Sequence, residues 1–90
     1  MSETIENPEV QEVALPTTVT KNHFLARLEE KVSDYNARLL LHSALVDSGV
    51  QSKNDENLDS IQAKSLCLSL IKKGGPAFKV GQSMYREILQ

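Results

Sequence analysis

His23, His42 and Cys67 are the side chains in this sequence best suited to catalysis or metal binding, and their spacing favours neither. On a continuous helix the two histidines would lie about 29 Å apart, which is too far for them to share a metal ion or a proton relay. Neither has a second histidine four residues away or a carboxylate beside it in a ligand pattern. We interpret His42 as a neutral histidine at the edge of the core; the alternative is a pH-sensitive residue at an interface. His23 is predicted to lie exposed in the first turn of a helix.

Cys67 lacks a neighbouring base that could generate a thiolate, and it lies between Leu66 and Leu68. It is therefore predicted to be a small buried hydrophobic residue. The carboxylates from residue 29 onward fall on polar helix faces or on the link between helices, and their spacing indicates no acid and base pair. The sequence thus predicts a protein that is not an enzyme, with no catalytic residues, no metal ligands and no cofactor.

A basic stretch with three glycines, residues 72–81, is the strongest candidate site. Its glycines would let the backbone approach a phosphate, but it matches neither of the common glycine-rich nucleotide motifs. If the residues that follow are helical, the polar ones share an outward face, as in a helix-turn-helix whose second helix reaches base edges or phosphates. The alternative is a helix end followed by a proline-initiated helix with ordinary solvated lysines. The candidate nucleic-acid or phosphate contacts are Lys72, Lys73, Lys79, Gln82, Ser83 and Arg86.

Charge is divided unequally along the chain. Its 90 residues contain 10 Lys and Arg against 12 Asp and Glu, a formal net charge of −2. Residues 1–16 contain four glutamates and no basic residue, whereas residues 60–90 contain five basic residues and one glutamate. The near-neutral total argues against a strongly basic nucleic-acid binder but leaves room for a local basic face. No run approaches the ~18 apolar residues of a membrane span, no signal peptide is recognisable, and the single cysteine suits a cytoplasmic protein.

Residues 1–19 are predicted to form a disordered acidic arm, and residues 20–90 a single small helical domain. The arm holds Pro8 and Pro16, and its few apolar residues follow neither helical nor strand spacing for long. Such a segment cannot bury enough apolar surface to offset the entropy lost on ordering. The glutamates at every third position could alternatively mark one face of a short helix, which the prolines disfavour.

The clearest periodic element is a long helix predicted over residues 22–47. Apolar residues and one histidine recur there at alternating spacings of 3 and 4, the pattern of a helix that packs against a partner helix. Thr20 or Asn22 is predicted to cap its start without a full capping box, and Gly49 to end it. The resulting seam, our candidate protein interface, consists of Leu25, Leu28, Val32, Tyr35, Leu39, His42 and Val46.

Two shorter helices are predicted over residues 58–73 and 77–89, which gives an all-α fold. In the helix over residues 58–73, Lys72 and Lys73 lie in the last turn, where cations complement the helix dipole. Gly74 with Gly75 ends that helix. Residues 76–82 could be helix or an extended connector, because Gly81 weakens the helix propensity there. We expect both helices to pack against the long first helix. The helix over residues 58–73 should run antiparallel to it, because the connections are short.

The apolar surface of the first two predicted helices is wider than one small core needs. About 70 ordered residues without tryptophan give a modest core, so burial shared with a second chain is favoured. We therefore expect a non-catalytic small helical accessory or regulatory protein that acts through protein–protein interaction as a homodimer. The alternative is a dimeric helix-turn-helix-like nucleic-acid-binding protein that uses the basic C-terminal third. No membrane partner is expected.

Overall fold

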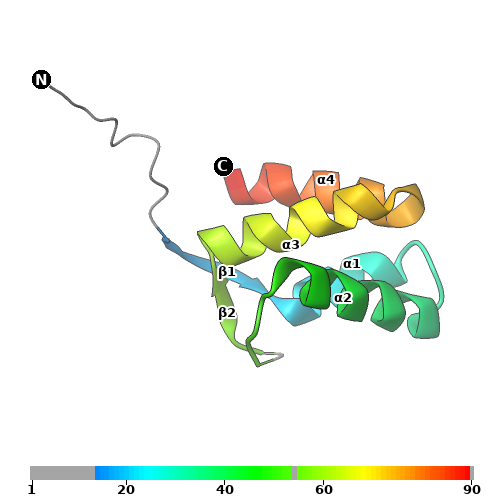
Figure 1. Ribbon diagram of the computed structural model, residues 1–90, viewed down its shortest axis with the longest axis horizontal. Coiled ribbons are helices and arrows are strands. Elements are labelled where there is room, and N and C mark those ends of the chain that lie inside the picture. The colour runs from blue at the N-terminus through cyan, green and yellow to red at the C-terminus, as the bar shows by residue number, and fades with distance from the viewer. Residues whose placement is uncertain (1–13, 54, 90) are drawn as a thin grey trace, which may run out of the picture.

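Four helices and two short strands make up the described part of the chain, residues 14–53 and 55–89 of a computed structural model (Figure 1). In chain order the elements are β1 (Pro16–Thr20), α1 (Lys21–Glu29), α2 (Asp34–Ser48), β2 (Asn57–Asp59), α3 (Ser60–Lys73) and α4 (Gly75–Leu89). Helices α1 and α2 form one layer and α3 and α4 another, with the strands at one end (Figure 1). The predicted all-α fold is confirmed only in part: the described residues are mostly helical, but they also form a small two-stranded sheet. Residues 1–13 of the predicted arm lie outside the described residues.

The single helix predicted over residues 22–47 is wrong, because the chain leaves the helix after Glu29 and starts a new one at Asp34. Ser33 caps the new helix, and its hydroxyl accepts the backbone N–H of Asn36 at 3.2 Å. The apolar spacing runs through the break unchanged, so periodicity could not reveal it. The break brings two carboxyls together, and hydrogen bonding between them raises the pKa of Glu29 and lowers the pKa of Asp34.

Strands β1 and β2 form an antiparallel two-stranded sheet that joins distant parts of the chain. The Thr17 hydroxyl donates to the Leu58 carbonyl at 2.6 Å, although these residues are 41 positions apart. Residues 16–20 are therefore a strand, which the arm predicted over residues 1–19 did not anticipate, and the helix predicted from residue 58 begins at Ser60. Threonine and valine suit a strand, but the partner strand lies beyond the reach of any local pattern.

Each helix that follows a strand begins with a capping box. At the start of α1, the Thr20 hydroxyl accepts the His23 N–H at 3.3 Å, and His23 Nδ1 accepts the Thr20 N–H at 3.0 Å. At the start of α3, Asp59 and Gln62 exchange the equivalent bonds at 2.8 and 3.1 Å. Of the two predicted caps, Thr20 and Asn22, the structure uses Thr20. The full capping box was not expected, because a histidine takes the place of the usual Glu or Gln. His23 is exposed, as predicted.

Both helix ends that the sequence marks with glycine are confirmed. Gly49 has φ 73° and donates its N–H to the Leu45 carbonyl at 3.0 Å, which ends α2. Gly74 has φ 75° and is the single residue between α3 and α4, which run antiparallel (Figure 1). Both backbones lie in the left-handed region that favours glycine. Residues 76–82, left open between helix and connector, are helical.

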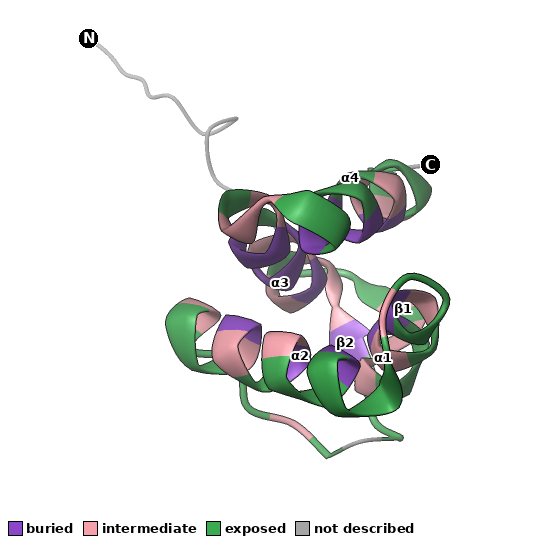
Figure 2. Ribbon diagram, turned by 90° about the vertical axis from the view of Figure 1, so that its right-hand side faces the viewer, coloured by how far each residue is buried: buried purple, intermediate pink, exposed green. Residues whose placement is uncertain are grey.

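The core lies between the two helix layers (Figure 2). Phe24 and Leu28 of α1 are fully buried, as are Leu66 and Leu70 of α3. Helix α4 approaches α3 closely because Gly81 has no side chain: a Cβ there would come within 2.7 Å of the Cys67 carbonyl oxygen. The other buried apolar residues are Ala37, Leu41, Ala44, Val50, Leu58, Ala63, Cys67, Ala77, Val80 and Met84.

Candidate interaction surface

The outward face of α2 carries a row of exposed side chains, which we call the α2 stripe: Tyr35, Leu39, His42 and Val46. Their spacings of 4, 3 and 4 place them in line along the helix. Tyr35 is 71% exposed, Leu39 50% and Val46 65%. The buried residues of α2, Ala37, Leu41 and Ala44, lie on the other side of the helix, which faces the core (Figure 2). Helix α2 is therefore apolar on two sides, and its own chain covers one of them.

The structure divides the predicted seam into two sets with different surroundings. Leu28 is fully buried, and Leu25 and Val32 are partly buried against the core. The four residues from Tyr35 onward form the exposed α2 stripe. The seven residues share one face only on a continuous helix, and the break before Asp34 separates them. The interpretation of His42 as a core-edge residue is wrong, because it is exposed.

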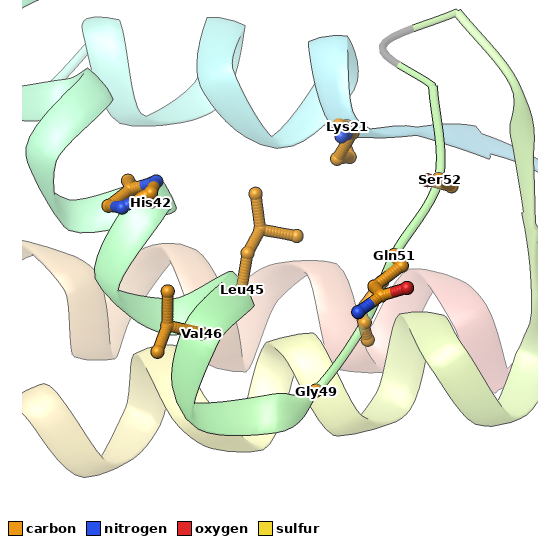
Figure 3. Close-up of a pocket in the computed structure, with 8 residues that line it drawn as sticks. Lys21, His42, Leu45, Val46, Gly49, Gln51 and Ser52 are labelled. Carbon is orange, nitrogen blue, oxygen red and sulfur yellow. The ribbon is translucent and has the colours of Figure 1, made fainter.

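A groove of about 470 Å³ runs beside the C-terminal half of the stripe (Figure 3). Leu45 lies between α2 and the start of α1, and the segment after Gly49 forms the far wall (Figure 3). A smaller hollow of about 150 Å³ continues from it between α1 and α2, and both include Lys21, His42 and Leu45. We call the larger hollow the α2 groove; it is lined by Lys21, His42, Leu45, Val46, Gly49, Val50, Gln51 and Ser52. Since His42 and Val46 belong to both features, stripe and groove form one continuous surface.

The six predicted nucleic-acid or phosphate contacts do not form one site. Lys73 is a structural residue: its ammonium donates to Ser43 Oγ at 2.6 Å and to Asp47 Oδ2 at 2.9 Å, which joins α3 to α2. Lys72 is exposed at the end of α3. The other four, Lys79, Gln82, Ser83 and Arg86, lie on the outward side of α4, with Ser83 partly buried.

A basic recess of about 180 Å³ joins α1 to α4, and it includes two residues that the sequence analysis missed. Arg27 and Lys31 lie there with Lys79 and Ser83, and Glu30 is the one acidic residue in the lining. The Arg27 guanidinium donates to Ser83 Oγ at 3.4 Å and forms an ion pair with Glu87. No local signal could have grouped these residues, because Arg27 and Ser83 are 56 positions apart.

Cys67 is buried, as predicted, and burial raises the pKa of its thiol to about 12 because desolvation disfavours the thiolate. At pH 8 the reactive thiolate therefore forms only when the core opens. We expect a thiol reagent such as DTNB to modify native Cys67 at least about 100-fold more slowly than the urea-unfolded chain. An exposed reference thiol, Gln82→Cys, should react at the unfolded rate. Equal rates at Cys67 and at this reference would contradict a closed core.

The same thiol gives a pH dependence with a defined sign. An unfolded cysteine titrates near pH 8.5, so the raised folded pKa of Cys67 favours the folded state only while the thiol is protonated. This contribution is complete below about pH 8.5 and is lost as the pH rises towards 12. Urea denaturation at rising pH should show a smaller loss of stability in Cys67→Ala than in the wild type. An identical pH dependence in the two proteins would refute this assignment.

The described residues contain neither a metal-binding cluster nor a membrane-spanning helix. No three His, Cys, Asp or Glu side chains within residues 14–53 and 55–89 come together as metal ligands. None of the four helices in this part of the chain has the length and apolar character needed to cross a bilayer. Comparisons of the chain with models of protein families, with curated proteins and with solved structures found no match.

Proposed function

We propose that this chain is a non-catalytic helical accessory or regulatory protein that binds protein through the α2 stripe and the α2 groove and associates with a second copy of itself. The observation that carries the proposal is the exposed apolar row on α2, opposite the face that builds the core. A row of large apolar side chains beside a groove, on so small a domain, is typical of an interaction site.

The composition of the surface supports this function. Tyrosine is enriched among the residues that dominate binding energies, and Tyr35 is the most exposed large apolar side chain of the described chain. Leu39 and Val46 add apolar area in line with it. Lys21, Gln51 and Ser52 supply a polar edge along the groove, as the rim of an interface requires.

Self-association through this face can be tested with the full chain. Sedimentation velocity over a wide concentration range should show a reversible monomer–dimer equilibrium. NMR spectra recorded along the same dilution series should then change at α2 and at residues 49–52, and stay constant on the outward side of α4. A protein that is monomeric at every concentration would rule out the proposed self-association. NMR changes confined to α4 would exclude the α2 surface as the interface.

Nucleic-acid binding is the second candidate function, and the basic recess favours it. Arg27 and Lys31 extend the predicted basic face beyond Lys79 and Arg86, so four cations lie on or beside the outward side of α4. Such a face can neutralise several backbone phosphates. The ion pair of Arg27 with Glu87 and the presence of Glu30 weaken the positive potential. This second function is therefore less well supported than protein binding.

A double variant separates the basic face from the fold. Both side chains are exposed, so Lys79→Ala with Arg86→Ala should change the free energy of unfolding by no more than about 0.5 kcal/mol. If the chain binds DNA, the slope of log K against log salt should fall by about 2, since each lost phosphate contact removes about one unit. Fluorescence anisotropy at several salt concentrations measures this slope. Loss of the fold in the double variant would contradict the outward position of these residues.

A further inference from the structure

We infer that a second copy of this chain covers the α2 stripe with its own α2 in antiparallel orientation, so that Tyr35 of each copy lies in the α2 groove of the other. This inference rests on the proposed function and specifies its partner and geometry. It is carried by three observations: the symmetry of the stripe, the position of the groove, and the exposure of Tyr35.

The stripe has the symmetry that an antiparallel copy of itself requires. Its spacings of 4, 3 and 4 read the same in both directions, so a two-fold axis midway between residues 40 and 41 superposes the row on itself. Leu39 then lies opposite the second copy's His42, and Tyr35 opposite the second copy's Val46. In such an interface each contact occurs twice, because residue i meets j and j meets i.

The groove lies where this pairing brings the partner's tyrosine. Val46 is at once the last member of the stripe and part of the groove lining. Tyr35 and Val46 are eleven positions apart, about 16 Å along α2, so each copy presents an aromatic side chain at one end and a groove at the other. The groove volume of about 470 Å³ is ample for one aromatic side chain.

The lining of the groove matches the chemistry of a tyrosine. A buried tyrosine needs apolar atoms against its ring and a polar partner for its hydroxyl. Leu45 and Val46 provide the apolar wall, and Gln51 and Ser52 provide polar atoms on the opposite wall (Figure 3). Lys21 at the start of α1 adds a cation that can contact the face of an aromatic ring.

The parallel arrangement of two α2 helices fits less well. It would place Tyr35 against Tyr35 and His42 against His42, and both grooves would remain empty. A stable dimer buries about 800 Å² on each partner, more than a single row of four side chains supplies. The antiparallel pairing adds α1 and the segment after Gly49 to the buried surface, because the tyrosine reaches them through the groove.

Cysteine cross-linking tests the orientation. One chain carries Leu39→Cys and the other His42→Cys, with a size tag on one of them, and the mixture is oxidised gently. Facing helix positions bring Cα atoms within the roughly 4.4–6.8 Å that a disulfide spans, so the mixture should give a covalent heterodimer. The native Cys67 is buried and should therefore not form a disulfide between chains. Gln82→Cys, exposed on α4, is the control that should not cross-link.

The outcomes distinguish the geometry from the proposed function. A heterodimer between positions 39 and 42 supports the antiparallel copy. A Leu39→Cys homodimer without the heterodimer overturns the orientation but keeps α2 as the interface. An associating protein that cross-links at neither position overturns this inference and the proposed surface together. A protein that stays monomeric in sedimentation overturns this inference and the proposed self-association.

A second measurement tests whether Tyr35 lies in the α2 groove of the other copy. Truncation of a buried interface tyrosine should weaken dimerisation of Tyr35→Ala by at least about 30-fold, whereas Tyr35→Phe, which keeps the ring, should lose much less. Phe78→Ala removes an aromatic side chain that is 39% exposed on α4, and it should leave the dimerisation constant unchanged. Circular dichroism verifies that each variant is folded. Equal dimerisation constants for Tyr35→Ala and the wild type would overturn the placement of Tyr35 in the groove of the other copy.

Discussion

Replacing Gly81 with alanine is expected to lower the free energy of unfolding by about 1–3 kcal/mol, the range for overpacked sites. The new methyl group would meet the Cys67 carbonyl oxygen at 2.7 Å and the Ile71 backbone nitrogen at 3.0 Å, and both are backbone atoms that cannot turn aside. Helices α3 and α4 would have to separate, which opens the core around Met84. A domain of this size has about 4–11 kcal/mol of stability, so the loss is a large fraction of the total.

Urea denaturation followed by circular dichroism measures this change. Gln82→Ala is the matched control, because it alters the next residue of the same helix on its exposed side. The control should be neutral or slightly stabilising, since alanine has the higher helix propensity. Alanine also has the higher helix propensity at position 81, so a Gly81→Ala protein that is more stable than the wild type would show that the two helices do not approach as closely as described.

Leu39→Asp is expected to leave the protein folded and to abolish the proposed self-association. Leu39 is half exposed on the side of α2 that faces away from the core, so a carboxylate there remains in water in the monomer. In a dimer through the α2 stripe the same carboxylate would be buried without a partner, on both copies. A penalty of about 3 kcal/mol or more makes dimerisation more than about 100-fold weaker.

Leu41→Asp is the comparison that separates the two sides of the helix. Leu41 is 8% exposed and belongs to the core, so the same substitution two residues away should unfold the chain. Circular dichroism reports whether each variant is folded, and sedimentation velocity reports its oligomeric state. If Leu39→Asp unfolds as Leu41→Asp does, Leu39 is not on an outward face. A folded Leu39→Asp that associates as strongly as the wild type would exclude the stripe as the interface.

The features that could be predicted from sequence are those encoded locally. Gly49 and Gly74 end helices because their immediate neighbours define the turn, and Cys67 is buried because it lies in an apolar run. The break before Asp34 was missed because the spacing of 3 and 4 continues through it, and the serine cap at Ser33 was the signal that competed with the periodicity.

The missed parts of the candidate surfaces depend on contacts between distant residues. Arg27 joins the α4 face, and Lys73 is held by Ser43 and Asp47, across separations that no linear pattern encodes. All four residues of the α2 stripe belong to the seam that the sequence predicts. Which residues of that seam the core covers could not be predicted, because this depends on where the other helices pack.

The sheet formed by β1 and β2 determines which part of this chain is freest to vary. It fixes the residues after position 56 to those before position 21, so the connection that follows the buried Val50, whose described residues are mostly exposed, does not have to hold the two helix layers together. Doubling the length of a flexible loop raises the free energy of loop closure by only about 0.6 kcal/mol, so insertions in this connection should destabilise the fold little. Gln51 and Ser52 of the same connection form a wall of the α2 groove. A change in the length of this loop would therefore alter the shape of the α2 groove while the four helices that support it stay as they are.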